Sequence, residues 1–208
     1  MKGIVTDIKY QKRNASRVNI FIDGDYAFSV PLLSASSLKP GQKLSPSEID
    51  AFRHEHDVYK AYSTAIGYLT RSPRSKSEIE THLRGKKFSK PIIEQTIQKL
   101  EGNTYINDET YARIFVENRE RFHPRSTFAL RFELKQKGVK ENIINQVLES
   151  ANDLELAWKA VKGKLYRWQA LPENQLKEKI LSFLSRRGFN YDIANDTLEK
   201  VLDSLKTD

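Results

Sequence analysis

Hydrophobic and polar positions recur along the chain with a period of about 50 residues. In the stretch 126–148, Leu130 and Leu134 lie four apart and therefore share one face of a helix, while Ile143 and Leu148 belong to the apolar face of a second helix. Gly138 stands between the two helices, where a residue in the left-handed conformation commonly ends a helix. The stretch therefore predicts a helix, a tight turn and a second helix.

The same pattern occurs twice more in the chain. A shift of 51 residues upstream and a shift of 50 residues downstream each restore the register. The matching positions upstream are Ser75, Ile79, Leu83, Phe88, Ile92, Ile93 and Ile97, and those downstream are Ile180, Leu184, Gly188, Phe189, Ile193 and Leu198. Repeats of this length form helical arrays in which each unit buries its apolar face against its neighbours. We expect a mainly α fold, a curved and modular tandem array of three three-helix units.

The first 44 residues follow a different pattern, in which apolar and polar positions alternate. Residues 18–22 and 26–30 predict two strands joined by Asp23-Gly24-Asp25, a hairpin loop that needs positive φ angles, and 4–10 predicts a third strand that turns through 13–16. A small antiparallel sheet is therefore expected, followed by a linker at 32–44. The expected division of the chain is 1–44, 45–104, 105–151 and 152–208.

Polar residues mark the expected starts of the helices. Ser45 and Ser75 are each followed three residues later by Glu, which predicts a capping box. Asp108 and Asp153 are the predicted caps of the first helix in the second and third units. Pro124 is expected to end a helix because proline cannot continue the backbone hydrogen bonds.

Basic residues gather in the middle of each unit. The windows 71–87, 119–140 and 159–187 hold 21 of the 35 Lys and Arg residues but only 6 of the 27 Asp and Glu residues. A stacked array would present them as a repeated positive stripe, suited to a polyanion or to an acidic groove on a protein. The alternative for each single window is that its charges simply cover a helix face exposed to solvent.

The candidate chemistry favours binding over catalysis. The chain has no Cys, no glycine-rich phosphate loop and no long apolar run, so we expect a cytoplasmic protein without a membrane span. His54 and His56 lie two apart on a predicted helix and point in different directions. No metal, cofactor or enzymatic activity is expected, although a nuclease that uses Asp23 and Asp25 is one alternative. Most tyrosines are expected in the core, and Tyr166 beside Arg167 and Trp168 is the expected exception.

Several short motifs, in this order and spacing, resemble one family. The motifs are Leu69-Thr70-Arg71, Ser75 with Glu78, Lys87-Phe88, Tyr105-Ile106-Asn107-Asp108, Tyr111-Ala112, Arg119, Glu133-Leu134, Lys137-Gly138-Val139 and the strands of 18–30. Together they resemble the RecX proteins, regulators of the bacterial recombinase RecA, in the Gram-positive form with an N-terminal β extension. The chain departs from the family at Lys87, where Gly is common, and at His123-Pro124.

The resemblance implies a monomer without an enzymatic site that binds the RecA filament and modulates it, most often by inhibition. Weak, non-specific contact with single-stranded or double-stranded DNA is also implied. We expect the basic stripe to make these contacts. Its candidate residues are Arg71, Arg74, Lys86, Lys87, Arg121, Arg125, Arg131, Lys135, Lys137, Arg186 and Arg187. The alternative is a stand-alone DNA-binding protein of the helix-turn-helix type.

Overall fold

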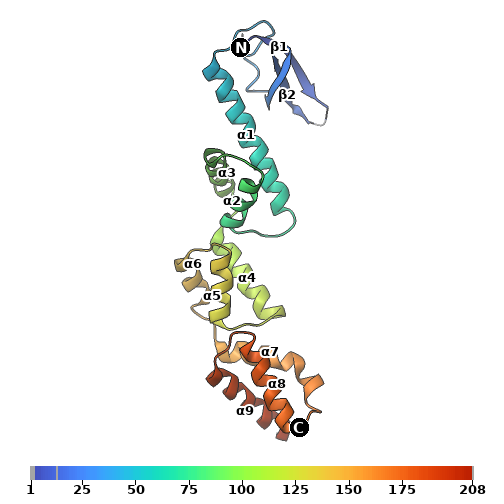
Figure 1. Cartoon of the computed structure of the whole chain (residues 1–208), viewed down its shortest axis with the longest axis vertical. Coiled ribbons are helices and arrows are strands. Elements are labelled where there is room, and N and C mark those ends of the chain that lie inside the picture. The colour runs from blue at the N-terminus through green and yellow to red at the C-terminus, as the bar shows by residue number, and fades with distance from the viewer. Residues whose placement is uncertain (1–2, 13, 208) are drawn as a thin grey trace. The chain divides into compact units, whose positions relative to one another are not determined.

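The computed structural model describes residues 3–12 and 14–207, and in this part of the chain a three-stranded sheet precedes nine helices (Figure 1). The strands are β1 (Val5–Gln11), β2 (Asn14–Ile22) and β3 (Asp25–Pro31). The helices are α1 (Pro46–Leu69), α2 (Lys76–Gly85), α3 (Lys90–Gly102), α4 (Asp108–Phe122), α5 (Thr127–Gln136), α6 (Glu141–Leu148), α7 (Asp153–Trp168), α8 (Glu173–Ser185) and α9 (Tyr191–Thr207). The predicted fold class, mainly α with a small N-terminal sheet, is confirmed.

The described residues form two compact units. The first contains residues up to 72 together with 79–105, and the second contains 73–78 together with the residues from 106 onward. The short segment 73–78, which includes the first turn of α2, therefore packs with α4 to α9. The predicted division into four parts and the curvature of the array stay predictions.

The sheet is antiparallel, in the order β1-β2-β3. Asp23 and Gly24 have φ angles of 52° and 95°, as a two-residue turn of type I′ requires, and the predicted hairpin is confirmed. The Asp23 carboxylate accepts the N–H groups of Gly3 and Ile4 at 3.0 and 3.1 Å, so this side chain fixes these two residues on the turn. The turn expected at 13–16 is wrong for 14–16, because β2 already begins at Asn14; Arg13 lies outside the described residues.

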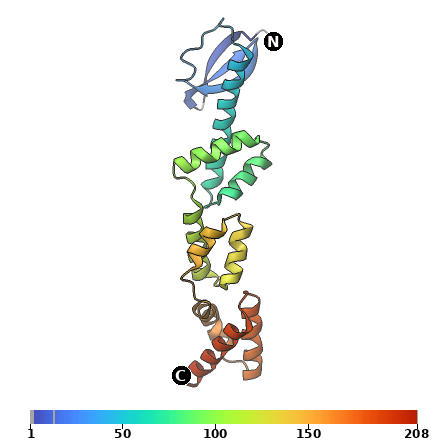
Figure 2. The ribbon, with the colours of Figure 1, turned by 90° about the vertical axis from the view of Figure 1, so that its left-hand side faces the viewer.

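The segment 32–44 is not a free linker. Leu38 and Leu44 are buried in the same core as Phe28, and the Leu44 N–H donates to the Gly3 carbonyl at 2.8 Å. Phe52 of α1 stacks on Phe28 with ring centroids 5.5 Å apart, which joins the sheet to α1. Figure 2 shows the sheet beside the first part of this helix. Burial of these apolar side chains supplies the support that a small sheet needs in water.

Helix α1 begins with the predicted capping box. Ser45 accepts the Glu48 N–H, and the Glu48 carboxylate accepts the Ser45 N–H at 2.8 Å. The helix then runs unbroken to Leu69. His54 contacts Gln95, whereas His56 contacts Ser29, so the two imidazoles do point in different directions.

In the second unit, α4 to α9 share one hydrophobic core. Figure 1 shows α4, α5 and α6 as one group of helices and α7, α8 and α9 as another. Leu130 and Leu134 of α5 are fully buried, and so are Ile180 and Leu184, their predicted counterparts on α8. The repeated apolar pattern therefore marks core positions.

Each repeat keeps a left-handed residue between its second and third helices: Gly138 (φ 73°), Gly188 (φ 86°) and Lys87 (φ 65°). A Cβ atom at Gly138 would lie 2.3 Å from the Cβ of Ser77, and one at Gly188 would lie 2.7 Å from the Oγ of Ser126. Glycine is required at both turns because the start of another helix packs directly on them. Lys87 is exposed, so a side chain is tolerated there at the cost of local backbone strain alone.

We therefore expect Gly138→Ala to lower the free energy of unfolding by more than about 3 kcal/mol, since backbone strain of about 1–3 kcal/mol adds to the collision with Ser77. Urea unfolding followed by circular dichroism measures the loss. Gly41→Ala is the matched control, because Gly41 also has a positive φ (87°) but open space around it. Equal losses in the two variants would contradict the packing argument.

Candidate functional site

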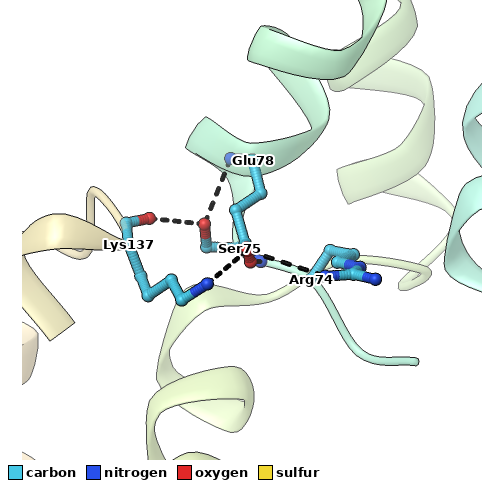
Figure 3. A network of polar contacts seen from close by, with 4 residues as sticks. All are labelled: Arg74, Ser75, Glu78 and Lys137. Atoms are coloured by element: carbon cyan, nitrogen blue, oxygen red, sulfur yellow. Dashed lines mark hydrogen bonds and ion pairs between the residues drawn. The ribbon is translucent and has the colours of Figure 1, made fainter. Parts of the chain in front are cut away.

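Two of the predicted contact residues, Arg74 and Lys137, form polar contacts at the start of α2 within the second unit (Figure 3). The Ser75 hydroxyl donates to the Lys137 carbonyl at 2.5 Å and accepts the Glu78 N–H at 3.2 Å. The Glu78 carboxylate contacts Lys137 Nζ at 2.8 Å and Arg74 Nη1 at 3.7 Å. Arg74 and Lys137 are therefore engaged in holding the chain together.

The start of α5 is fastened in the same manner. The Ser126 N–H donates to the Arg187 carbonyl at 3.1 Å, and Arg187 Nη1 donates to the Pro124 carbonyl at 2.6 Å. Glu133 pairs with Arg119 at 2.7 Å and with Arg125 at 2.9 Å. Burial, together with the nearby charge of Arg125, lowers the pKa of Arg187. We call these two sets of contacts the helix-start junctions.

The predicted caps Asp108 and Asp153 are wrong. Asn107 and Asn152 cap α4 and α7, because each side chain accepts a backbone N–H of the first turn. The neighbouring Asp carboxylates instead join the helix-start junctions: Asp108 accepts the Lys76 N–H at 2.8 Å, and Asp153 accepts the Thr127 N–H at 2.7 Å. These are N–H groups of the first turn of α2 and α5, which have no partner within their own helix.

Charge within the first junction is balanced by Glu78. Burial would raise the pKa of Glu78, but hydrogen bonds from Lys137 and the Ser75 N–H outweigh it, and the pKa lies below its ordinary value. Burial and the adjacent Glu78 raise the pKa of Tyr111, which lies against this carboxylate. The negative form of Glu78 is therefore the form that stabilises the fold.

The other predicted contact residues are placed as follows. Arg131 and Lys135 both pair with Glu141, whose pKa they hold below its ordinary value, and Arg186 bonds the Ser182 hydroxyl. Four are exposed and take no part in these contacts: Arg71, Lys86, Lys87 and Arg121. Whether any of the eleven touches a partner stays a prediction.

A cavity of about 750 Å³ in the second unit, between the end of α4 and the middle of α7, brings cations together. We call it the basic cavity. Its positively charged lining residues are Arg121, Lys159, Lys162, Lys164 and Arg187. Glu117 and Glu120 also line it, and Glu120 lies 3.9 Å from Lys159. Phe122 is 60% exposed at the same cavity, and the Arg121 guanidinium lies 5.1 Å from its ring centroid.

The basic cavity has local causes in the sequence. His123 and Pro124 end α4, which leaves Arg121 and Phe122 on its last turn, where cations complement the helix dipole. Gly163 adds no side chain on α7, and a Cβ there would meet open space. Sequence reasoning selected Arg121 and Arg187 but missed Lys159, Lys162 and Lys164. The signal was their position in the third basic window, where Lys162 and Lys164 follow Lys159 by three and five residues.

The expectation that most tyrosines lie in the core is wrong for several of them. Tyr105 and Tyr191 are 57% and 71% exposed, whereas Tyr111 is buried as expected. Trp168 is also buried, edge-on to Phe183 with centroids 5.0 Å apart, while Tyr166 is exposed. Of the residues expected to be the exception, Tyr166 therefore lies at the surface and Trp168 lies in the core.

The described residues offer neither a cluster of metal ligands nor a membrane-spanning helix. No group of three or more His, Cys, Asp or Glu side chains in 3–12 and 14–207 is arranged to hold a metal ion. Within the same ranges, no helix has the length and apolar character needed to cross a membrane.

We expect Lys137→Met to lower the free energy of unfolding at pH 7 by about 1 kcal/mol, because it removes the partly exposed partner of Glu78. The folded-state pKa of Glu78 is depressed, so its stabilisation is present above the unfolded pKa of about 4.3 and is lost as pH falls through the folded value. The difference between the two proteins should therefore shrink below about pH 4.3.

Chemical unfolding at pH 7 and at pH 3 measures this difference. Lys177→Met is the control, since it breaks a pair with Glu173 at the surface and should change stability by less than about 0.5 kcal/mol. A loss for Lys137→Met that is independent of pH would contradict the role given to Glu78.

Comparison with known proteins gives the family. Residues 3–45 match the RecX N-terminal domain, and 61–100, 107–148 and 151–198 match the first, second and third three-helix domains of RecX. The regulatory protein RecX of Bacillus cytotoxicus is 33% identical over 96% of this chain and 77% of its own length. That of Bacillus subtilis is 31% identical over 95% and 76%.

Solved structures agree with this assignment. A crystal structure of regulatory protein RecX, 28% identical, superposes with a TM-score of 0.70 over 92% of this chain and 97% of that chain. RecX from Lactobacillus salivarius, also 28% identical, gives 0.59 over 71% and 97%. This chain, with its N-terminal sheet and its three helical repeats, therefore belongs to the RecX family of regulatory proteins.

Proposed function

We propose that this protein binds the RecA recombinase filament on single-stranded DNA and restrains its assembly and activity in homologous recombination and DNA repair. Membership of a family of regulatory proteins supports the regulatory role, and the resemblance described above supplies the partner. The structural observation that carries the proposal is the basic cavity. It gathers cations that the helix-start junctions do not use, namely Arg121, Lys162 and Lys164.

The charge of the basic cavity suits a filament that carries DNA. Five basic residues line it against two acidic ones, one of which already lies near Lys159. A positive concave surface raises the local concentration of a polyanion and speeds encounter, and both effects fall with salt. Contact with a filament at such a surface would be sensitive to ionic strength and to the reversal of a few charges.

The second candidate function is binding to DNA without RecA, and Phe122 favours it. An exposed aromatic ring beside cations is the arrangement on which bases of a single strand can stack. Such binding would be salt-dependent and nearly independent of sequence, whereas a helix-turn-helix reader prefers its site by about 4 kcal/mol or more. The two candidates differ in whether RecA is needed.

The test is RecA ATP hydrolysis on single-stranded DNA, titrated with this protein against assembling and preformed filaments at two salt concentrations. We expect inhibition at protein concentrations well below that of RecA, because restraint of filament growth acts at few sites. We expect the variant Arg121→Glu, Lys162→Glu, Lys164→Glu to need at least about tenfold more protein for the same inhibition, since three contacts reverse sign.

Arg113→Glu, Lys140→Glu, Lys177→Glu is the matched control. It changes the net charge equally at residues of the same unit that do not line the basic cavity, of which Arg113 and Lys140 are exposed and Lys177 is partly exposed, so its inhibition should stay close to that of the parent. Helical circular dichroism verifies that both variants are folded. Inhibition that requires enough protein to cover the DNA, and that disappears on longer strands, would favour the second candidate function.

A further inference from the structure

A second cavity lies in the first unit, and the function proposed above makes no use of it. It has a volume of about 280 Å³, and β2, the end of β3, α1 and α3 contribute to its walls. Its lining residues are Arg17, Pro31, Glu55, Val58, Tyr59, Tyr62, Lys99 and Asn103. We call it the Arg17 cavity.

Arg17 is an unusual residue for a cavity wall because it is only 2% exposed. Its Nη2 donates to the Ser29 carbonyl at 2.6 Å and approaches the Ser29 hydroxyl at 3.3 Å, and both of these partners are neutral. Its Nε is buried and has no hydrogen-bond partner within the described part of the chain. An arginine is charged at any ordinary pH, and a buried charge is costly unless it is paired and fully hydrogen-bonded.

The surroundings compensate this charge only in part. The guanidinium lies over the Tyr59 ring, 3.5 Å from its centroid. This contact is favourable, but the ring accepts no hydrogen bond from the N–H groups, which lie in the plane of the guanidinium. Glu55 lines the same cavity, yet its carboxylate already accepts the Ser34 hydroxyl at 2.8 Å. Burial lowers the pKa of Arg17, against the opposing effects of Tyr59 and Glu55.

The remaining polar groups of the Arg17 cavity also favour an anion. Lys99 is an exposed cation on its rim, and Asn103 beside it donates to the Tyr62 hydroxyl at 3.1 Å. Tyr59 covers the guanidinium of Arg17, and Tyr62 also lines the cavity. Arg17 therefore has little contact with water, which strengthens any charge interaction that it forms. Two cations, one of them buried, therefore face a cavity with a single carboxylate that is already hydrogen-bonded.

We propose that the Arg17 cavity binds an oxyanion, a phosphate or a carboxylate group, whose oxygens accept hydrogen bonds from Arg17 and Lys99. Guanidinium groups match the planar geometry of such oxygens. The volume lies at the lower limit of small-molecule sites, so the ligand is a small free anion or an acidic side chain of a bound protein. This proposal goes beyond RecA binding and does not depend on it.

The test is a titration of the full chain with inorganic phosphate, with acetate and with N-acetylglutamate amide, followed by ¹H–¹⁵N NMR at constant ionic strength made up with chloride. We expect saturable shifts of the backbone amides of Ser29, Tyr59 and Asn103. Saturation by phosphate alone identifies a phosphate group as the ligand, and saturation by the glutamate analogue identifies an acidic side chain. If no anion gives saturable shifts at these amides, the proposal is overturned.

Three variants separate binding from folding. Lys99→Glu changes an exposed rim residue and should weaken binding by about fivefold or more without changing the unfolding midpoint. Lys60→Glu is the matched control, because Lys60 is exposed on α1 and lies outside the lining of the Arg17 cavity. Arg17→Gln should weaken binding by at least about thirtyfold. Equal affinities of Lys99→Glu and Lys60→Glu would contradict the placement of the anion.

Discussion

Backbone N–H groups at the start of a helix have no partner inside that helix, and this constraint organises the second unit. At α2 and at α5 a serine cap and an aspartate contributed by a later helix accept them, and the Ser75 hydroxyl is shared with the carbonyl of a later turn. Because these hydrogen bonds are short-ranged and directional, the helix start and the turn must meet closely. That closeness excludes a Cβ atom at Gly138 and Gly188.

The same constraint explains why some basic residues pair with carboxylates inside the fold and others do not. Cations near the junctions compensate the carboxylates that close packing buries, as Lys137 does for Glu78 and Arg125 does for Glu133. Other cations of the basic windows, such as Arg121 and Lys162, are exposed to solvent, and five basic residues line the basic cavity against two acidic ones. A positive window in the sequence thus contains two physical classes of side chain, and charge counting alone does not separate them.

The sequence was sufficient for the fold because its signals are local and periodic. Apolar spacing located the buried positions Leu130, Leu134, Ile180 and Leu184. Helix-capping patterns located the glycine turns and the serine caps. The rules for helix caps consider only the helix that follows a residue. They misassigned Asp108 because its carboxylate accepts the N–H of Lys76, which lies 32 residues earlier at the start of α2. Arg17 gave no signal, since its burial arises from contacts with Ser29 of β3 and Tyr59 of α1, which no local pattern encodes.

The junctions are directional, and the two terminal repeats each lack one half of them. The first repeat offers a serine-capped helix start at Ser75, but its turn carries Lys87 in place of glycine. The third repeat offers the turn at Gly188, but α8 begins at Glu173 after Pro172, which makes no side-chain cap. Only the middle repeat has both. The middle repeat is therefore bound through both of its halves: its helix start at Ser126 packs on the turn at Gly188, and its turn at Gly138 packs on the start of α2.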